Sequence, residues 1–193
     1  MEVMEAITGR RSIRKYKTDP VPDEALKTVL EAARLAPSWA NTQCWRIIVV
    51  RDNETKWKLS EILISNRPGR PNPATEAMKN APIVIAACAE RGVSGFYKDE
   101  AGQLLPSTDK GDYWYMFDVA LAMQNMVLAA HSLGLGTVHV GLFDAPAAAK
   151  ILGVPDNAAI VELVPLGWPD EAPLARPRKE ISEFIFSEKY QVK

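Results

Sequence analysis

The nine-residue run APIVIAACA, residues 81–89, constrains the fold of this chain more than any other feature. Its residues are apolar throughout, so a strand formed here has apolar side chains on both of its faces. Such a strand is buried on both sides. We therefore expect it at the centre of a sheet rather than at an edge.

The apolar periodicity and the helix-ending residues predict the other elements. Helices are expected at 2–9, 21–36, 54–65, 113–133 and 146–152, and strands at 45–51, 134–141, 158–167 and 181–190. Two polar, glycine-containing stretches, residues 66–76 and 92–112, are expected to be loops or lids. Helices and strands are interspersed without clear βαβ spacing, so the fold class is α+β with a mostly antiparallel sheet.

Composition limits the class of protein. The 193 residues suit a single domain, residues 1–193, of which 167–193 form a linker and a C-terminal arm. The net charge of -1 calls for neither nucleic acid nor an anionic membrane. Residues 116–134 are apolar but contain Asp118, Gln124, Asn125 and His131, so they predict a buried helix rather than a membrane span.

The N-terminus and the cysteines suggest a location. No basic segment followed by an apolar run opens the chain, so we expect no secretory signal. The two cysteines, Cys44 and Cys88, form no C-x-x-C pair, which favours a reducing cytoplasm. With only two histidines as well, the sequence predicts metal-free chemistry.

The end of the chain carries apolar side chains beyond a proline-rich linker. Ile181, Phe184, Ile185 and Phe186 follow the passage WPDEAPLARPRKE. Apolar surface of this kind needs cover. It packs either on a partner subunit, as an exchanged arm, or on its own domain.

Two clusters of side chains could carry chemistry. The run RRSIR contains Arg10, Arg11, Ser12 and Arg14, which suit a phosphate group, although a solvated surface run has the same composition. A second basic group, Arg176, Arg178 and Lys179, lies near the other end, and sequence spacing cannot show whether the two groups meet.

The stretch LAPSWANTQCWRIIVV, residues 35–50, is the other candidate. Its Ser38, Asn41 and Gln43 could bind the edge of a planar ring, or could form an ordinary capped turn after Pro37. Trp39 and Trp45 suit a core or an interface. The signatures of zinc proteases, serine hydrolases and P-loop proteins are absent, and the glycines at 134–141 precede a strand instead of following one, unlike a dinucleotide fingerprint.

Four passages in this order resemble the FMN-dependent nitroreductase family. They are RRSIRKY, APSWANTQCWRIIVV, GLGTVHVGLFD and VPLGWPDEAPLARPRKEISEFI, and together they span nearly the whole chain. The resemblance implies a nitroreductase-like homodimer, with a central sheet surrounded by helices, an exchanged C-terminal arm and FMN at the interface. It also implies hydride uptake from NADH or NADPH and ping-pong reduction of nitroaromatics, quinones or related small-molecule acceptors.

The resemblance assigns roles residue by residue. Arg10, Ser12, Arg176 and Arg178 match phosphate positions, with Arg11 beside them, and Arg14 matches the basic position that faces the flavin pyrimidine edge. A positive charge there stabilises the anionic reduced flavin. The segment contributed by the other subunit is matched by Ser38, Trp39, Asn41 and Gln43. The segment whose backbone lies against the ring is matched by Val138, His139, Val140 and Gly141.

Some features stay open. The family usually has proline where this chain has Cys44, which is interpreted as a small packed residue or as a thiol near the site. No protein nucleophile is expected, and Tyr97, Tyr113 and Tyr115 are weak candidates for a proton donor. His131 is interpreted as structural. The alternatives are a flavin-fragmenting or reductive-dehalogenating relative of the same fold, or a non-catalytic FMN-binding protein.

Overall fold

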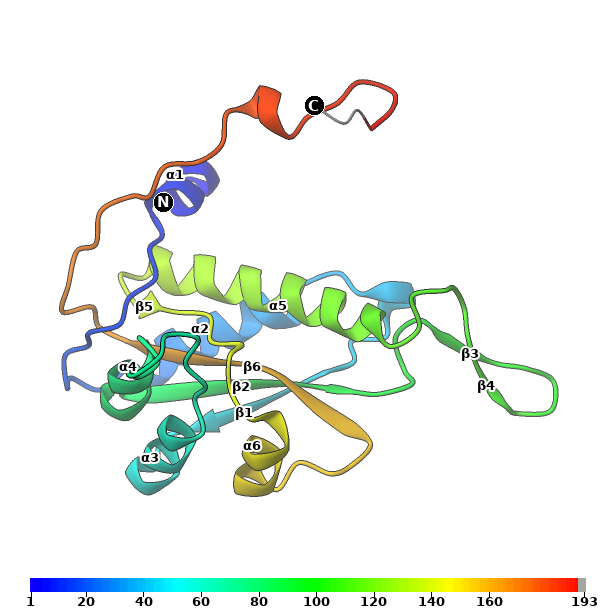
Figure 1. The fold of residues 1–193 in the computed structure, drawn as a ribbon, viewed down its shortest axis with the longest axis horizontal. Helices are drawn as coiled ribbons and strands as arrows, with labels where there is room; N and C mark the ends of the chain where they lie inside the picture. The colour runs from blue at the N-terminus through cyan, green and yellow to red at the C-terminus, as the bar shows by residue number, and fades with distance from the viewer. Residues whose placement is uncertain (191–193) are drawn as a thin grey trace.

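The computed structural model describes residues 1–190 (Figure 1). The helices are α1 (Val3–Gly9), α2 (Asp23–Arg34), α3 (Asn53–Glu61), α4 (Thr75–Asn80), α5 (Tyr113–Ser132) and α6 (Ala145–Leu152). The strands are β1 (Trp45–Val50), β2 (Ile83–Glu90), β3 (Phe96–Lys98), β4 (Leu104–Pro106), β5 (Gly136–Thr137) and β6 (Ala158–Gly167). Two short 3₁₀ turns are η1 (Trp39–Asn41) and η2 (Ile181–Glu183).

The main sheet has the strand order β1-β2-β6-β5, and every neighbouring pair is antiparallel. The predicted α+β class and antiparallel sheet are therefore confirmed. The strand predicted from APIVIAACA is β2, and it lies between β1 and β6. The register sets Trp45 opposite Ala89 and Ile83 opposite Leu166.

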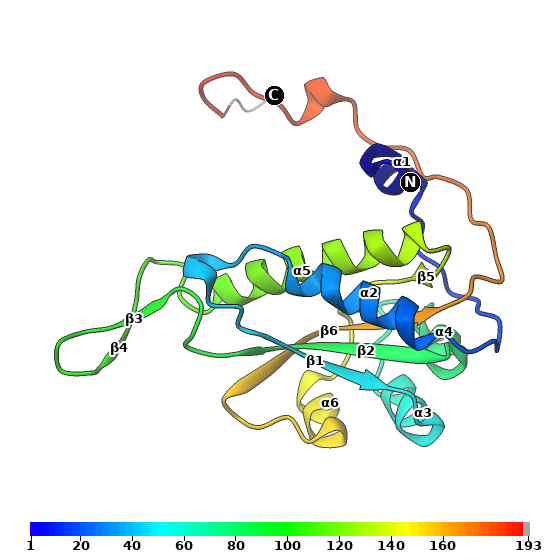
Figure 2. The same ribbon diagram turned by 180° about the vertical axis from the view of Figure 1, so that it is seen from behind.

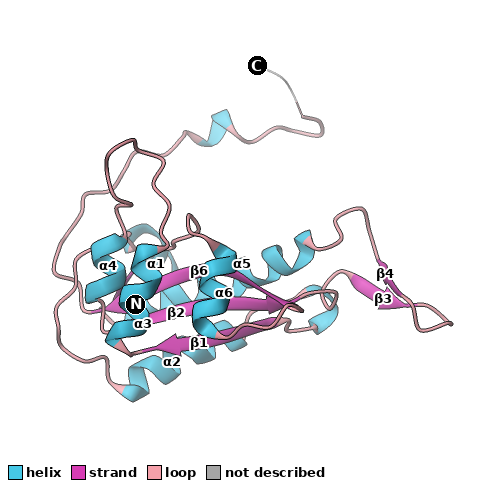
Figure 3. Ribbon diagram, turned by 60° about the horizontal axis from the view of Figure 1, so that its bottom comes forward, coloured by secondary structure: helices cyan, strands magenta, loops and turns pink. Residues whose placement is uncertain are grey.

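Alternate side chains of β2 enter two separate cores, which is why the strand is apolar throughout. Ile83, Ile85, Ala87 and Ala89 pack with α2 and α5, whereas Val84, Ala86 and Cys88 pack with α3, α4 and α6. The two helix layers lie on opposite faces of the sheet (Figures 2 and 3). Burying a side chain such as Ile85 contributes about 1.5–3 kcal/mol, so both layers stabilise the fold.

Besides shifts of one or two residues at the ends of other elements, three differences from the prediction lie in the main body of the fold. The helix expected at 54–65 ends at Glu61, because the next residues pair instead with the segment before α6: the Ile64 amide donates to Leu142 O over 3.0 Å. The strand expected at 134–141 is reduced to β5 and a single bridge between Val140 and Leu163. Helix α4 was not predicted, because prolines crowd the residues before it.

Two segments project from this body. The stretch 92–112 contains the hairpin β3–β4, seen at one end of the molecule in Figure 1. The tail, which we define as residues 174–190, runs away from the sheet past α1. Leu174 is 91% exposed and Phe184 is 57% exposed, so the apolar side chains of the tail lack cover from their own domain.

The strand predicted at 181–190 is wrong for this chain. Residues 181–183 form η2, whose N-terminal end is closed by a capping box: the Glu180 amide donates to Glu183 Oε2 over 2.7 Å. A strand needs a neighbouring strand to satisfy its backbone groups, and within residues 1–190 none lies beside the tail. The last three residues of the arm predicted at 167–193 lie outside the described residues.

The helix α1 forms a second exposed apolar surface, in addition to that of the tail. Val3 and Met4 are mostly exposed, although the short helix was expected to have an apolar side. None of the helices formed by residues 1–190 is long and apolar enough to cross a lipid bilayer.

Candidate functional site

The RRS sequence lies in the connector that leaves α1 and runs beside β5. Ser12 forms a parallel bridge with Thr137, and the Ile13 amide donates to Thr137 O over 2.9 Å. Gly136 makes this close approach possible, because a Cβ there would lie 2.8 Å from Ile13 Cγ1. The connector is therefore fixed against the start of the segment 138–141.

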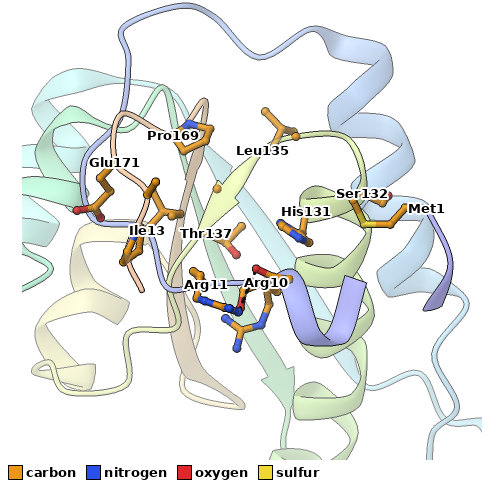
Figure 4. Close-up of a pocket in the computed structure, with 15 residues that line it drawn as sticks. Met1, Arg10, Arg11, Ile13, His131, Ser132, Leu135, Thr137, Pro169 and Glu171 are labelled. Atoms are coloured by element: carbon orange, nitrogen blue, oxygen red, sulfur yellow. Dashed lines mark hydrogen bonds between the residues drawn. The ribbon is translucent and has the colours of Figure 1, made fainter. Parts of the chain in front are cut away.

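A cavity of about 570 Å³ opens between α1, the end of α5, β5 and the linker after β6. Arg10 and Arg11 lie at one side of it, with His131 and Thr137 beside them (Figure 4). Glu171 lines the linker side, where its carboxylate accepts hydrogen bonds from the Arg14 and Lys15 backbone amides. The polar lining is thus mostly cationic or a hydrogen-bond donor.

The charges around this cavity repel one another. Burial lowers the pKa of Arg10, and the neighbouring charges of Arg178 and Arg11 lower it further. Burial, followed by the charges of Arg10 and Arg11, also lowers the pKa of His131. Within residues 1–190, no ion pair joins any of these three arginines to a carboxylate.

We call Arg10, Arg11 and Arg178 the arginine cluster. The chain brings Arg178 of the tail close enough to Arg10 to perturb it, which sequence spacing alone could not show. Arg11 Nη1 donates to the carbonyl oxygens of Thr8, Gly9 and Arg10. An anion placed here would relieve the repulsion and supply an acceptor to Arg10 and Arg178. Arg176 is exposed on the tail, and its role at a phosphate stays a prediction.

The next part of the candidate site lies along residues 138–141. Val138 and Val140 direct their side chains into the core, so only their backbone is available to a ligand. His139 is on the other side, where its Nδ1 lies 2.6 Å from Glu162 Oε2. A Cβ added to Gly141 would meet no atom within 4 Å, so open space lies above this residue.

Two polar atoms in the candidate segments are unsatisfied. Within residues 1–190, Arg14 Nε and Thr42 Oγ1 are buried and have no hydrogen-bond partner. Buried donors are rarely left unpaired in folded proteins. Arg14 lies in the connector after α1 and Thr42 in the turn before β1, so the two atoms belong to different parts of the candidate site.

The polar turn at residues 38–43 has an unusual backbone. Ala40, Asn41 and Gln43 have positive φ angles of 44°, 57° and 49°. The Gln43 amide donates to Ser38 Oγ over 2.9 Å, and Gln43 Nε2 donates to Asn41 Oδ1 over 3.2 Å. The stretch is therefore an ordered turn as well as the end of a helix, in which Asn41 and Gln43 are exposed and Ser38 and Thr42 are half-buried.

Within one chain, the 38–43 turn and the arginine cluster do not meet. The turn contacts α5 at Asp118, because the Trp39 amide donates to both carboxylate oxygens. The cavity contacts α5 at His131, 13 residues further along. At about 1.5 Å per helical residue, the two contact points are roughly 20 Å apart.

Comparison with known proteins identifies the chain. The sequence model of the nitroreductase family matches residues 7–168. The chain belongs to the nitroreductase family. An NADH dehydrogenase of Thermus thermophilus is 32% identical over 190 residues, covering 89% of this chain and 88% of the relative.

Solved structures of the family have the same fold. A nitroreductase family protein from Clostridium novyi NT is 30% identical, with a TM-score of 0.74, and the match covers 89% of this chain and 87% of that one. The NADPH:FMN oxidoreductase from Vibrio harveyi, solved with NAD⁺, is 27% identical, with a TM-score of 0.79 and coverages of 98% and 78%. The nitroreductase-like fold is therefore confirmed.

Cys44, where the family usually has proline, is fully buried. Burial first, and the neighbouring Asp118 second, raise the pKa of its thiol to about 11. The thiol is therefore protonated at neutral pH and unreactive, as in a packed apolar residue.

Sequence reasoning missed Asp118, Glu162 and Glu171 as parts of the candidate site. The one available signal was the presence of a charged residue, Asp118, within the apolar stretch 116–134. No comparable signal marked the other two. Among residues 1–190, no group of three or more His, Cys, Asp or Glu side chains could hold a metal ion.

Proposed function

We propose that this protein is a homodimeric enzyme that reduces nitroaromatic, quinone or related small-molecule acceptors with electrons from NADH or NADPH, by a ping-pong mechanism. Its membership of the nitroreductase family makes it an FMN-dependent NAD(P)H oxidoreductase. FMN, when bound, accepts a hydride from the nicotinamide and passes electrons to the acceptor. The residues of the chain bind and orient that cofactor.

The observation that carries the proposal is the arginine cluster at the cavity between α1 and β5. Arg10, Arg178 and Ser12 would hold the phosphate, because they present charged and hydroxyl donors without a carboxylate partner. Arg14, with its unpaired Nε, would face the pyrimidine edge and stabilise negative charge on it. The backbone of residues 138–141 would lie against the ring, and a backbone amide there would donate to the ring nitrogen N5.

The roughly 20 Å along α5 between the 38–43 turn and the cavity supports a site shared by two subunits. Ser38, Trp39, Asn41 and Gln43 cannot reach a phosphate-anchored ligand of their own chain if that span separates them. They would instead contact the flavin of the partner. The exposed apolar surfaces of α1 and the tail are the surface that a dimer would cover.

The deciding experiment is the absorbance spectrum of the purified protein, recorded before and after anaerobic addition of NADH or NADPH. We expect a yellow protein whose flavin absorbance is bleached, and an acceptor that restores it over many turnovers. A colourless protein that fails to bind added FMN contradicts the proposal. FMN binding without reduction by either nucleotide would favour the flavin-fragmenting or dehalogenating chemistry, and stoichiometric FMN without turnover would favour a binding protein.

A further inference from the structure

Asp118 is a fully buried carboxylate at the centre of a hydrogen-bond network formed by groups of the chain itself. No other Asp or Glu among residues 1–190 is buried. Its oxygens accept from the Trp39 amide over 3.1 and 3.2 Å and from the Ser94 hydroxyl over 2.6 Å. Cys44 Sγ lies 3.8 Å from Oδ2. Burying a carboxylate is costly unless hydrogen bonds compensate for the lost water, and here three donors do so.

The 38–43 turn depends on this carboxylate for its position. Positive φ angles at three residues that are not glycine are unfavourable, and such a backbone persists only when its surroundings fix it. The side chains of the three strained residues, Ala40, Asn41 and Gln43, are exposed and cannot fix the turn by packing. The bond from the Gln43 amide to Ser38 Oγ lies within the turn itself. Of the side-chain hydrogen bonds that join this backbone to α5, those of the Trp39 amide to Asp118 are the ones present in residues 1–190.

The base of the β3–β4 hairpin meets the same carboxylate. Ser94 is 1% exposed and donates to Asp118 Oδ2. The following residue, Gly95, has a φ of 79°, and a Cβ there would lie 2.1 Å from Trp114 Cδ1. Trp114 in turn donates through Nε1 to Thr108 Oγ1 over 3.0 Å. The hairpin base is thus docked on the first turns of α5, with Ser94 and Asp118 as its buried polar contact.

We propose that Asp118 is a positioning residue that fixes the 38–43 turn and the hairpin base to α5 together. The turn and the hairpin would then be presented to the flavin site as one unit. This inference rests on the proposed function, in which the turn contacts the flavin of the partner subunit. It assigns to Asp118 the geometry of those contacts, although Asp118 itself touches no ligand.

Asp118→Asn tests the proposal, with Asp112→Asn as the matched control. The asparagine keeps the shape but places a donor group where an acceptor oxygen faces the Trp39 amide or the Ser94 hydroxyl. Asp112 is exposed at the start of the same helix and makes no side-chain cap, so its change removes a charge without this network. The readouts are the FMN dissociation constant, the visible circular dichroism of bound FMN, and hydrogen exchange of the apoprotein.

We expect Asp118→Asn to raise the FMN dissociation constant at least tenfold, to alter the dichroism at saturating FMN, and to speed exchange in both 38–44 and 94–98. The control should match the parent. The proposal is overturned if affinity stays within twofold of the parent, or if exchange rises evenly over the whole chain, as a general loss of stability would cause. If the parent itself fails to bind FMN, the proposed function fails, while the exchange of the two segments still decides whether Asp118 holds them.

Ser94→Ala keeps the proposal testable should Asp118→Asn not fold. It removes one donor and leaves the Trp39 amide in place. We expect faster exchange at 94–98 and a smaller increase at 38–44, because the carboxylate loses one of the bonds that orient it. Unchanged exchange in both segments contradicts a shared anchor.

Discussion

The 38–43 turn and the tail are both surface segments, yet the chain holds them in opposite ways. The turn is strained, but a buried carboxylate on α5 fixes its Trp39 amide. The tail is unstrained over most of its length, but its apolar side chains stay exposed beyond the linker. A segment that its own chain holds can be in place before any partner arrives. A segment with exposed apolar side chains gains its position only from another surface.

Ending the chain after Pro173 should have the largest effect, because it removes the segment that we propose packs on a partner subunit. The truncation deletes Arg178 together with the exposed Phe184 and Ile185. We expect a monomer by light scattering and an FMN dissociation constant raised by about 100-fold or more, or roughly 3 kcal/mol of binding free energy.

A double substitution, Phe184→Ser with Ile185→Ser, separates the two causes. It keeps Arg178 and removes only apolar surface. The dimer should therefore dissociate more readily, whereas Arg178 should still contact the FMN phosphate in the dimers that remain. A truncated chain that stays a stable, FMN-loaded dimer would show that the tail is not part of the interface.

Removing single arginines should have an intermediate effect on FMN affinity. Arg10 belongs to the body of the domain and Arg178 to the tail, so the two variants compare these regions directly. Arg10→Ala and Arg178→Ala should each weaken FMN binding by about 1–3 kcal/mol, the range for losing a hydrogen bond to a charged group. Fluorescence titration of the apoprotein with FMN measures this loss. Arg91→Ala, at an exposed turn, is the control. Unchanged affinity in both test variants refutes the phosphate placement.

The smallest effect is expected from the strain in the turn. Ala40 has a φ of 44°, which a β-branched residue adopts poorly and glycine adopts freely. Ala40→Val should lower the free energy of unfolding by about 1 kcal/mol, and the Tm by about 2–4 °C for a chain of this size. Ala40→Gly should stay close to the parent in thermal denaturation of the apoprotein. Equal Tm values for the two variants would mean that this backbone is not held in the left-handed region.

The sequence predicted the central strand and the long helix because both patterns are local. Alternate residues of 81–89 enter two cores, and the periodicity of 113–133 is complete within the helix. The tail strand was predicted wrongly for a related reason. Local composition can favour a strand, but a strand also needs a neighbour to accept its hydrogen bonds, and composition does not report whether one is there.

The candidate site was predictable where its residues form runs. RRSIR and the polar turn stand out in the sequence, and family resemblance assigns roles to both. The partners of Asp118 do not stand out, because Trp39, Cys44 and Ser94 lie 79, 74 and 24 residues away along the chain. Only the packing of the folded chain brings such residues to one carboxylate.

The capping box in the tail has a consequence for association. Glu180 and Glu183 close a turn that presents Ile181 and Phe184 before any surface receives them. Ordering a free backbone costs about 1–2 kcal/mol of conformational entropy per residue, and a turn that is already formed avoids part of that loss on docking. If the tail packs on a partner subunit, as proposed, the short 3₁₀ turn would lower the conformational entropy lost on association.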